Sequence, residues 1–278
     1  MLEQTIGDDV ARALKEDVGH GDITADLMPE NALGQSIILS REPMVVSGIP
    51  WVNQVFLKIN PEIQITWQVS ECDVLDKPAT LAVITGALRP ILTAERTALN
   101  FLQTLSGVAT ETKHYVKALE GTKAQLLDTR KTLPGLRQAL KYAVTCGGGV
   151  NHRMGLYDAI LIKENHIKAC GSIKAAVLAA REKKSGKWIE VEVETLEEFK
   201  IALEAAPDRI MLDNFDINML NKAVLLRAEK NIILEASGGI TLSNIKDIAQ
   251  TGIDYISVGA ITKSVRAIDL SLLLDDVS

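Results

Sequence analysis

The sequence predicts an α/β protein in which a small N-terminal α+β domain precedes a larger domain built on a parallel sheet. In the second part of the chain, short apolar strands alternate with helical stretches, which is typical of a parallel sheet. These strands are apolar on both faces, as buried parallel strands are. Aromatic residues make up only 4% of the 278 residues, so the core must consist mainly of Leu, Ile, Val and Ala, which suit α/β layers.

The N-terminal part combines helices with short strands. Apolar residues recur at helical spacing within residues 4–17. Strands separated by turns are expected at 35–46, 63–70 and 80–84. From 91 to 119 the pattern is helical again, and we expect Gly107 to break it. We therefore predict one domain at 1–107 and a second at 108–265.

The second domain repeats a strand–helix unit. The expected strands have the sequences QLLDT, DAILIK, WIEVEV, RIMLDN, IILEAS and YISVGA. Helices are expected at 135–145, 172–183, 196–206, 217–229 and 241–251. Six such strands suit an α/β barrel, complete or incomplete, or a doubly wound sheet. The last segment, 266–278, is expected to be a helix that packs back on the N-terminal domain.

Charge and cysteine content exclude several classes of protein. The net charge of −6 argues against a general affinity for nucleic acid or for an anionic membrane. Three cysteines without a C-x-x-C pair indicate reduced thiols and a cytoplasmic protein. The N-terminus lacks the apolar core of a signal peptide, and no apolar run approaches the ~18 residues of a membrane span. Any anion-binding site must therefore be a local basic cluster.

Nearly every expected strand of the second domain ends in a charged residue or a glycine. In a barrel these ends converge on one rim, where active sites lie. Arg suits carboxylates because its donors form a planar fork, and Lys suits phosphate as a point charge. Basic and acidic side chains occur together at these strand ends. The basic ones predict a substrate with several anionic groups, and the protein carboxylates would bind substrate hydroxyls or a metal ion. The set comprises basic Arg130, Lys131, His152, Arg153 and Lys163, acidic Glu192 and Asp213, and Glu190 and Glu235 as ion-pair partners that orient the basic residues.

Two loops late in the chain predict a phosphate site. Ser237-Gly238-Gly239 follows a strand and is expected to precede a helix that begins near Thr241. Val258-Gly259-Ala260 repeats this arrangement one unit later. Glycines allow backbone N–H groups to approach an anion, and a helix N-terminus adds favourable potential. Two adjacent loops of this kind form the usual phosphate site of a barrel.

A series of motifs spans nearly the whole chain. They are EDVGHGDITADL (16–27), ERTALNFLQTLSGVAT (95–110), LLDTRKTLPGLR (126–137), KYAVTCGGGVNHRMGLYDAILIKENHI (141–167), IEVEV (189–193), IMLDNF (210–215), LEASGGIT (234–241) and DYISVGAIT (254–262). Together these motifs resemble the quinolinate phosphoribosyltransferase family. The resemblance implies an α/β sandwich domain followed by an incomplete, seven-stranded α/β barrel, and a homodimer with shared active sites or a hexamer built from such dimers.

The resemblance also implies roles for the basic residues. Arg130, His152 and Arg153 would line the quinolinate pocket, joined by Arg96 of the partner subunit. Lys131 and Lys163 would lie where the pyridine dicarboxylate meets pyrophosphate.

The acidic residues and the loops would serve phosphoribosyl pyrophosphate. Glu192 and Asp213 would act on the ribose hydroxyls and on Mg²⁺, which would bind mainly through the substrate pyrophosphate; no organic cofactor is expected. The 5′-phosphate would be held by Ser237, Gly238, Gly239, Val258, Gly259 and Ala260. The expected catalytic residues are Lys131, Lys163, Glu192 and Asp213.

The implied activity is pentosyl transfer from phosphoribosyl pyrophosphate to quinolinate with decarboxylation, which gives nicotinate mononucleotide, pyrophosphate and CO₂ in de novo NAD biosynthesis. Three alternatives stay open from the residues alone. One is a phosphoribosyltransferase that uses nicotinate or another base. The others are a Schiff-base aldolase with Lys163 as its amine, and a non-catalytic protein that senses phosphate.

Overall fold

The computed structural model describes residues 2–183, 186–228 and 230–274. Two compact units divide the chain. The first contains the described residues within 1–113, 132–148 and 261–278, and the second those within 114–131 and 149–260. An N-terminal sheet domain and a C-terminal parallel α/β domain are therefore both present, as the sequence predicts. No helix of the described residues is long and apolar enough to cross a membrane.

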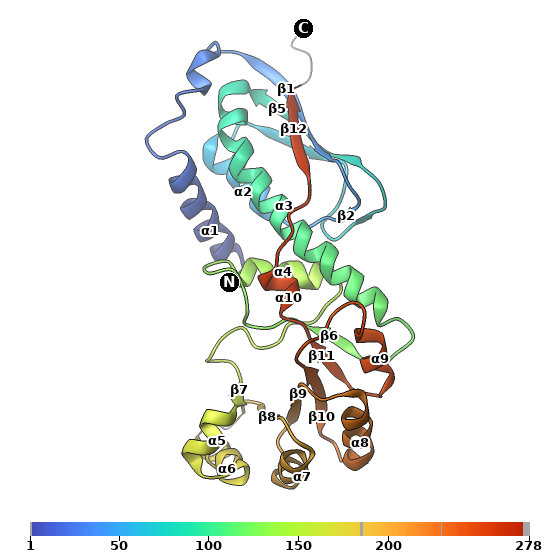
Figure 1. The fold of residues 1–278 in the computed structure, drawn as a ribbon. Coiled ribbons are helices and arrows are strands. Elements are labelled where there is room, and N and C mark those ends of the chain that lie inside the picture. Colours follow the sequence, from blue (N-terminus) through green and yellow to red (C-terminus); the bar gives the residue numbers. More distant parts are fainter. Residues whose placement is uncertain (1, 184–185, 229, 275–278) are drawn as a thin grey trace. The chain divides into compact units, whose positions relative to one another are not determined.

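The first unit contains an antiparallel sheet with the strand order β12-β1-β5-β3. These strands are β1 (Leu33–Ser40), β3 (Gln64–Trp67), β5 (Ala79–Ala87) and β12 (Leu270–Leu274), and β2 (Met44–Val45) pairs with β4 (Val74–Leu75). The expected helix at 266–278 is wrong, because Leu270 and Leu272 are buried on one face of an edge strand that pairs with β1 (Figure 1). Residues 275–278 of that expectation lie outside the described residues.

The helices of the first unit include one that the sequence did not indicate. They are α1 (Leu2–Asp17), the short η1 (Ala25–Leu27), α2 (Ile49–Ile59), α3 (Leu88–Ala118) and α4 (Arg137–Cys146). The unexpected helix α2 begins after Gly48, which has a φ of 116°, and it buries Trp51 and Phe56. The expected break at Gly107 is wrong, since α3 continues through it. A Cβ at Gly107 would lie 2.0 Å from the carbonyl oxygen of Arg266, so this glycine permits a close backbone approach inside a helix.

The second unit is built on a parallel sheet. Its strand order is β6-β11-β10-β9-β8-β7, and all pairs are parallel. The strands are β6 (Gln125–Leu127), β7 (Ile160–Ile162), β8 (Ile189–Val193), β9 (Arg209–Asp213), β10 (Ile233–Ser237) and β11 (Tyr255–Ser257). A parallel bridge from Leu127 to Val150 adds a seventh position beside β6. Among the described residues the ring stays open between Val150 and β7, which is the arrangement of an incomplete barrel.

Helices connect the strands of the second unit and lie around its sheet (Figure 1). They are α5 (Glu164–Cys170), α6 (Ile173–Lys183), α7 (Leu196–Ala205), α8 (Ile217–Arg227) and α9 (Ile245–Gln250), and α10 (Ala260–Lys263) follows β11. The last position of the expected helix 217–229 lies outside the described residues. Helix α9 begins at Ile245 and not near Thr241. Asn244 holds the preceding turn, because its Oδ1 accepts from the Thr241 N–H (2.9 Å) and its Nδ2 donates to the Gly239 carbonyl (3.1 Å).

Candidate active site

A pocket of about 340 Å³ opens at the carboxyl ends of the parallel strands in the second unit. In a parallel sheet the residues that follow each strand all lie at the same edge, and the pocket forms at that edge. Nine residues predicted from the sequence line it: Arg130, Lys131, His152, Arg153, Lys163, Glu192, Asp213, Glu235 and Ser237. The remaining lining residues are Thr129, Leu161, Met211 and Ser257.

The lining residues that the sequence reasoning missed include two apolar side chains. Leu161 lies two residues before Lys163, and Met211 lies two residues before Asp213. Because side chains two apart on a strand share a face, this spacing could have identified them. They give the pocket an apolar surface that suits a flat ring among otherwise charged groups.

Two arginines of the pocket lie near one another. Burial lowers the pKa of Arg153, and the positive charge of Arg130 acts in the same direction. The guanidinium of Arg153 donates from Nη1 to the carbonyl oxygen of Ala159 (3.2 Å), which fixes its direction. The carboxylates of Glu190 and Asp158 oppose this shift. A negatively charged ligand would further compensate the two neighbouring cations, so this part of the pocket suits an anion.

Lys163 and Glu192 form an ion pair across the carboxyl ends of β7 and β8. The side chain of Lys163 is 45% exposed, so the pair lies at the surface of the pocket and not in the core. Lys163 also stands directly before α5, and its backbone N–H donates to Nδ1 of His166 (3.0 Å). His166 therefore fixes the backbone of Lys163 while the ammonium group stays accessible.

Asp213 ends β9 and is held by the next residue. Asn214 Nδ2 donates to Asp213 Oδ2 (3.0 Å), and the Asn214 N–H donates to the carbonyl of Ser237 (2.8 Å). Asn214 has a φ of 59°, which this pair of hydrogen bonds stabilises. A Cβ at Gly238 would lie 2.2 Å from Asn214 Oδ1, so Gly238 is required for packing against Asn214.

The loop glycines of the predicted phosphate site differ in what surrounds them. Gly239 has a φ of 57°, and a Cβ at this position would meet no heavy atom within 4 Å, so its backbone is open to a ligand. A Cβ at Gly259 would lie 2.9 Å from Cδ of Lys131, so this glycine makes room for that lysine. Val258 offers little to a phosphate, because its side chain is buried and its N–H donates to the Leu127 carbonyl (2.9 Å). Ala260 begins α10.

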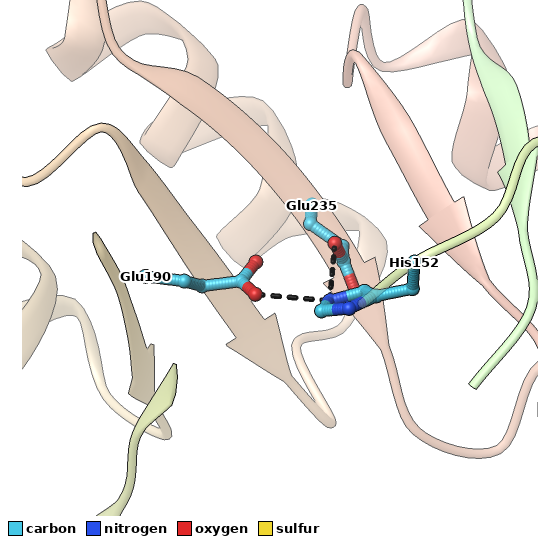
Figure 2. Close-up of side chains that lie close together, drawn as sticks. All are labelled: His152, Glu190 and Glu235. Carbon is cyan, nitrogen blue, oxygen red and sulfur yellow. Dashed lines mark hydrogen bonds and ion pairs between the residues drawn. The ribbon is translucent and has the colours of Figure 1, made fainter. Parts of the chain in front are cut away.

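A buried cluster of His152, Glu190, Glu235 and Arg209 adjoins the pocket. Figure 2 shows the first three of these side chains. Nε2 of His152 lies 3.0 Å from Glu190 Oε2 and 3.5 Å from Glu235 Oε2. Arg209 Nη1 donates to Glu235 Oε2 (2.9 Å). Both carboxyl groups are fully buried, as the expected ion pairs require.

Burial raises the pKa values of both carboxyl groups in this cluster. It raises the pKa of Glu235 to about 8, and the charge of Glu190 acts in the same direction. It also raises the pKa of Glu190 to about 7, although the cation of Arg209 opposes the shift. Because the two carboxyl groups interact, they titrate as a pair, and this pair retains a proton more readily than exposed carboxyls do.

Metal ligands are sparse among the described residues. Within that part of the chain, only His152, Glu190 and Glu235 bring three potential ligand atoms together. Arg209 already places a cation against these carboxylates, so the cluster fits a divalent ion poorly. Glu192 and Asp213 line the pocket with oxygen donors of the kind that Mg²⁺ prefers. These two carboxylates fit a magnesium ion that takes its other ligands from a bound substrate.

A larger hollow of about 430 Å³ lies in the first unit, between α1, α3 and the segment 134–136. Among the described residues that line it, the one basic side chain is that of Arg12, which is paired with Asp9 at 2.7 Å. This lining therefore lacks the cations that an anionic substrate needs. Arg96, on α3 of the same unit, has a side chain that is 58% exposed and lies 3.8 Å from Glu95. Its role in substrate binding stays a prediction.

Comparison with known proteins places the whole chain in one family. Residues 22–106 match the family model of the quinolinate phosphoribosyl transferase N-terminal domain, and residues 108–273 match that of the C-terminal domain. The chain is 42% identical over 275 residues to the nicotinate-nucleotide pyrophosphorylase [carboxylating] of Mycobacterium leprae, with 95% of each chain covered. It is 40% identical to a probable enzyme of the same name from Bacillus subtilis, with 92% of this chain and 89% of that protein covered.

The fold matches as well. The structure of the nicotinate-nucleotide pyrophosphorylase from Francisella tularensis superposes with a TM-score of 0.95 at 46% identity, covering 98% of this chain and 97% of that one. The pocket at the strand ends thus stands in a chain whose two domains both match one family. This chain belongs to the quinolinate phosphoribosyltransferase family.

Proposed function

We propose that the protein transfers the phosphoribosyl group of phosphoribosyl pyrophosphate to quinolinate, with loss of one carboxyl group as CO₂. The observation that carries this proposal is the pocket itself. Arg130, Lys131, Arg153 and Lys163 line it together with Glu192 and Asp213, and apolar Leu161 and Met211 complete it. A dianionic aromatic acid and a polyphosphate match this combination of charge and apolar surface. The relatives above are named nicotinate-nucleotide pyrophosphorylase [carboxylating], which describes the same reaction written in the reverse direction.

Arg130 and Arg153 are assigned to the carboxylates of quinolinate. Burial lowers the pKa of Arg153 and repulsion from Arg130 adds to the shift, so an anion bound between the two guanidinium groups would relieve part of this strain. A guanidinium presents two parallel donors to a carboxylate, so two such groups can fix a dicarboxylate ring in one orientation. Nicotinate has one carboxylate, so it would leave part of this charge uncompensated.

Glu192 and Asp213 are assigned to the ribosyl half. The pyridine nitrogen forms a bond to the anomeric carbon as the bond to pyrophosphate breaks, and positive charge develops on the ribose. Carboxylates next to the ring stabilise that charge. Lys163 is paired with Glu192, and pyrophosphate would compete with Glu192 for this ammonium group.

Decarboxylation follows from the charge on the ring. Once its nitrogen is ribosylated the pyridinium is cationic, and it accepts the electron pair left when the adjacent carboxylate departs as CO₂. A proton then replaces the carboxylate on that carbon, which gives nicotinate mononucleotide. The ring is the electron sink, so this assignment requires no organic cofactor.

Magnesium is assigned to the same pocket. Glu192 and Asp213 would hold it together with oxygens of the substrate, as their oxygen donors permit. When bound, the ion supplies positive charge that stabilises departing pyrophosphate. Lys131 is assigned the same electrostatic task, with its side chain placed against Gly259.

Assembly and location form a further part of the proposal. We assign the protein to the cytoplasm as a homodimer in which Arg96 of one chain completes the pocket of the other. The exposed side chain of Arg96 supports this assignment, because a cation on the surface of α3 is available to a second chain. A hexamer built from such dimers is compatible with the same contact.

Product analysis tests the proposed function. Purified protein is incubated with phosphoribosyl pyrophosphate and Mg²⁺, with either quinolinate or nicotinate, and the nucleotides are separated by chromatography. Nicotinate mononucleotide is expected from quinolinate alone. If nicotinate mononucleotide formed from nicotinate as fast as from quinolinate or faster, the protein would instead be a phosphoribosyltransferase that uses nicotinate. Borohydride inactivation that depends on an aldehyde or ketone substrate would support an aldolase that uses Lys163.

A further inference from the structure

The buried cluster of His152, Glu190, Glu235 and Arg209 makes contacts that the proposed reaction leaves unexplained. Replacing a buried ionic group by apolar residues of similar volume often leaves stability unchanged or improves it. Stability alone therefore gives little reason to place two carboxyl groups, each 0% exposed, beside a pocket for anions. The contacts of His152 indicate another role.

Both ring nitrogens of His152 are engaged within the protein. The backbone N–H of Arg153 donates to Nδ1 (2.7 Å), so Nδ1 carries no proton. Nε2 lies 3.0 Å from Glu190 Oε2 and therefore carries the proton of a neutral imidazole (Figure 2). The ring offers no further nitrogen to a substrate. It instead connects Glu190 to the main chain of Arg153.

Arg209, the fourth member of the cluster, is also held in place. The guanidinium carbon of Arg209 lies 4.8 Å from the centre of the Trp188 ring and 4.6 Å from that of Tyr255. Arg209 in turn contacts Glu235 at 2.9 Å and Glu190 at 3.9 Å. Cation–π contacts thus hold the arginine, and the arginine holds the two carboxylates in place.

Resting on the proposed function, we propose that Glu190, Glu235 and Arg209 are positioning residues for the pyridine dicarboxylate. They fix the tautomer and orientation of His152, and His152 fixes the backbone of Arg153, whose guanidinium binds a substrate carboxylate. The segment has two further anchors. Asp128 Oδ1 accepts from the His152 N–H (2.8 Å), and Ala159 accepts from the Arg153 guanidinium (3.2 Å). These two anchors hold the backbone N–H of His152 and the guanidinium of Arg153. The cluster in addition fixes the orientation of the His152 ring.

Calorimetry on three variants tests the proposal. Glu190→Ala leaves the Nε2 proton of His152 without its nearest acceptor, and we expect quinolinate to bind roughly tenfold more weakly, as for loss of a charged hydrogen bond. Affinity for phosphoribosyl pyrophosphate is expected to stay within roughly twofold of wild type. Glu190→Gln retains an oxygen acceptor for Nε2 and should restore most of the quinolinate affinity. Glu204→Ala, which removes an exposed carboxylate on α7, is the matched control.

A second measurement is independent of ligand binding and of variant folding. Long-range ¹H–¹⁵N NMR of wild-type protein with ¹⁵N-labelled histidine reports the tautomer of each of the four histidines, and His152→Gln assigns the relevant signals. The neutral Nε2–H form is expected for His152. An imidazolium or the Nδ1–H form would overturn the proposal, as would a folded Glu190→Ala variant that binds quinolinate as wild type does. Wild-type protein with no affinity for quinolinate would instead contradict the proposed function itself.

Discussion

Lys163 and Glu192 bind each other across the carboxyl ends of β7 and β8. The proposed function assigns the first to pyrophosphate and quinolinate and the second to ribose. In the ion pair these two groups neutralise each other. A substrate that carries its own anionic groups can replace Glu192 as the partner of Lys163, which frees a carboxylate at the place where positive charge develops.

Replacing Lys163 should lower activity strongly while stability changes little. An ion pair exposed to this degree contributes about 0.2–1 kcal/mol to folding. Lys163→Met is therefore expected to lose turnover while its Tm changes little, as measured by steady-state assay and thermal unfolding. Lys174→Met, on α6, removes a comparable exposed pair with Glu204 that does not line the pocket, and should retain turnover. A fully active Lys163→Met variant would exclude this lysine from the reaction.

Asp213 should act on the ribosyl half alone. Asp213→Asn removes the negative charge but keeps the shape of the side chain and its contact with Asn214. We expect lower turnover and a higher magnesium requirement, with quinolinate affinity nearly unchanged. Magnesium titrations and quinolinate calorimetry measure the two effects separately. Normal magnesium dependence together with lost quinolinate affinity would reverse the assignment.

Gly259 tests the placement of Lys131. Gly259→Ala puts a Cβ 2.9 Å from Cδ of Lys131 and should displace that side chain. The Michaelis constant for phosphoribosyl pyrophosphate is expected to rise while the fold is retained. Gly7→Ala adds the same methyl group on α1, where nothing lies within 4 Å, and serves as the control. An unchanged Michaelis constant in Gly259→Ala would remove Lys131 from the pyrophosphate site. Gly238→Val is a poorer probe, because it would displace Asn214.

The raised pKa of Glu235 predicts how stability depends on pH. Its ordinary value is 4.5, and burial raises it to about 8 in the folded protein. The folded state therefore binds a proton that the unfolded state has already lost in this range, so the free energy of unfolding should fall as pH rises from 4.5 to about 8.

Urea unfolding at several pH values measures this slope. Glu235→Gln cannot ionise, so its slope should be flatter than that of the wild type. Glu204→Gln is the control, because the pKa of Glu204 is lowered by Lys174 and this residue stays ionised throughout the same range. Equal slopes for wild type and Glu235→Gln would contradict the assignment of a retained proton to this group.

Mixed dimers test the role assigned to Arg96. Homodimers of Arg96→Ala and of Lys163→Ala should each be nearly inactive. In a mixed dimer one pocket collects both substitutions, and the other combines native Lys163 with native Arg96 of the partner subunit. Co-expression should therefore recover activity that neither variant shows alone. No recovery, in mixed dimers verified by mass spectrometry, would show that Arg96 does not complete a partner's pocket.

Much of the site could be predicted from the sequence because parallel strands impose a simple rule. Residues that follow such strands meet at one edge, so Lys163, Glu192 and Asp213 could be grouped from the strand pattern alone. Glu190 and Glu235 could be predicted as ion-pair partners of basic residues, but their contact with His152 could not. That contact, and the part that Arg209 takes in the cluster, depend on side-chain directions that are set by packing between strands.

Errors in the predicted fold have similar causes. The sequence predicts a helix end at Gly107, since glycine usually weakens a helix. This glycine instead admits the backbone at Arg266, which is distant in the sequence, and local sequence carries no sign of that contact. The segment Leu270–Leu274 is short and apolar, so its pattern suits a helix or a strand equally. Pairing with β1 decides the outcome.

Release of CO₂ tests the central claim most directly. Quinolinate labelled in the carboxyl group next to the ring nitrogen is incubated with the protein and Mg²⁺, with and without phosphoribosyl pyrophosphate, and labelled CO₂ is collected. We expect release only when phosphoribosyl pyrophosphate is present, in an amount equal to the nicotinate mononucleotide and pyrophosphate formed. Release without phosphoribosyl pyrophosphate, or nucleotide formation without release, would contradict this claim.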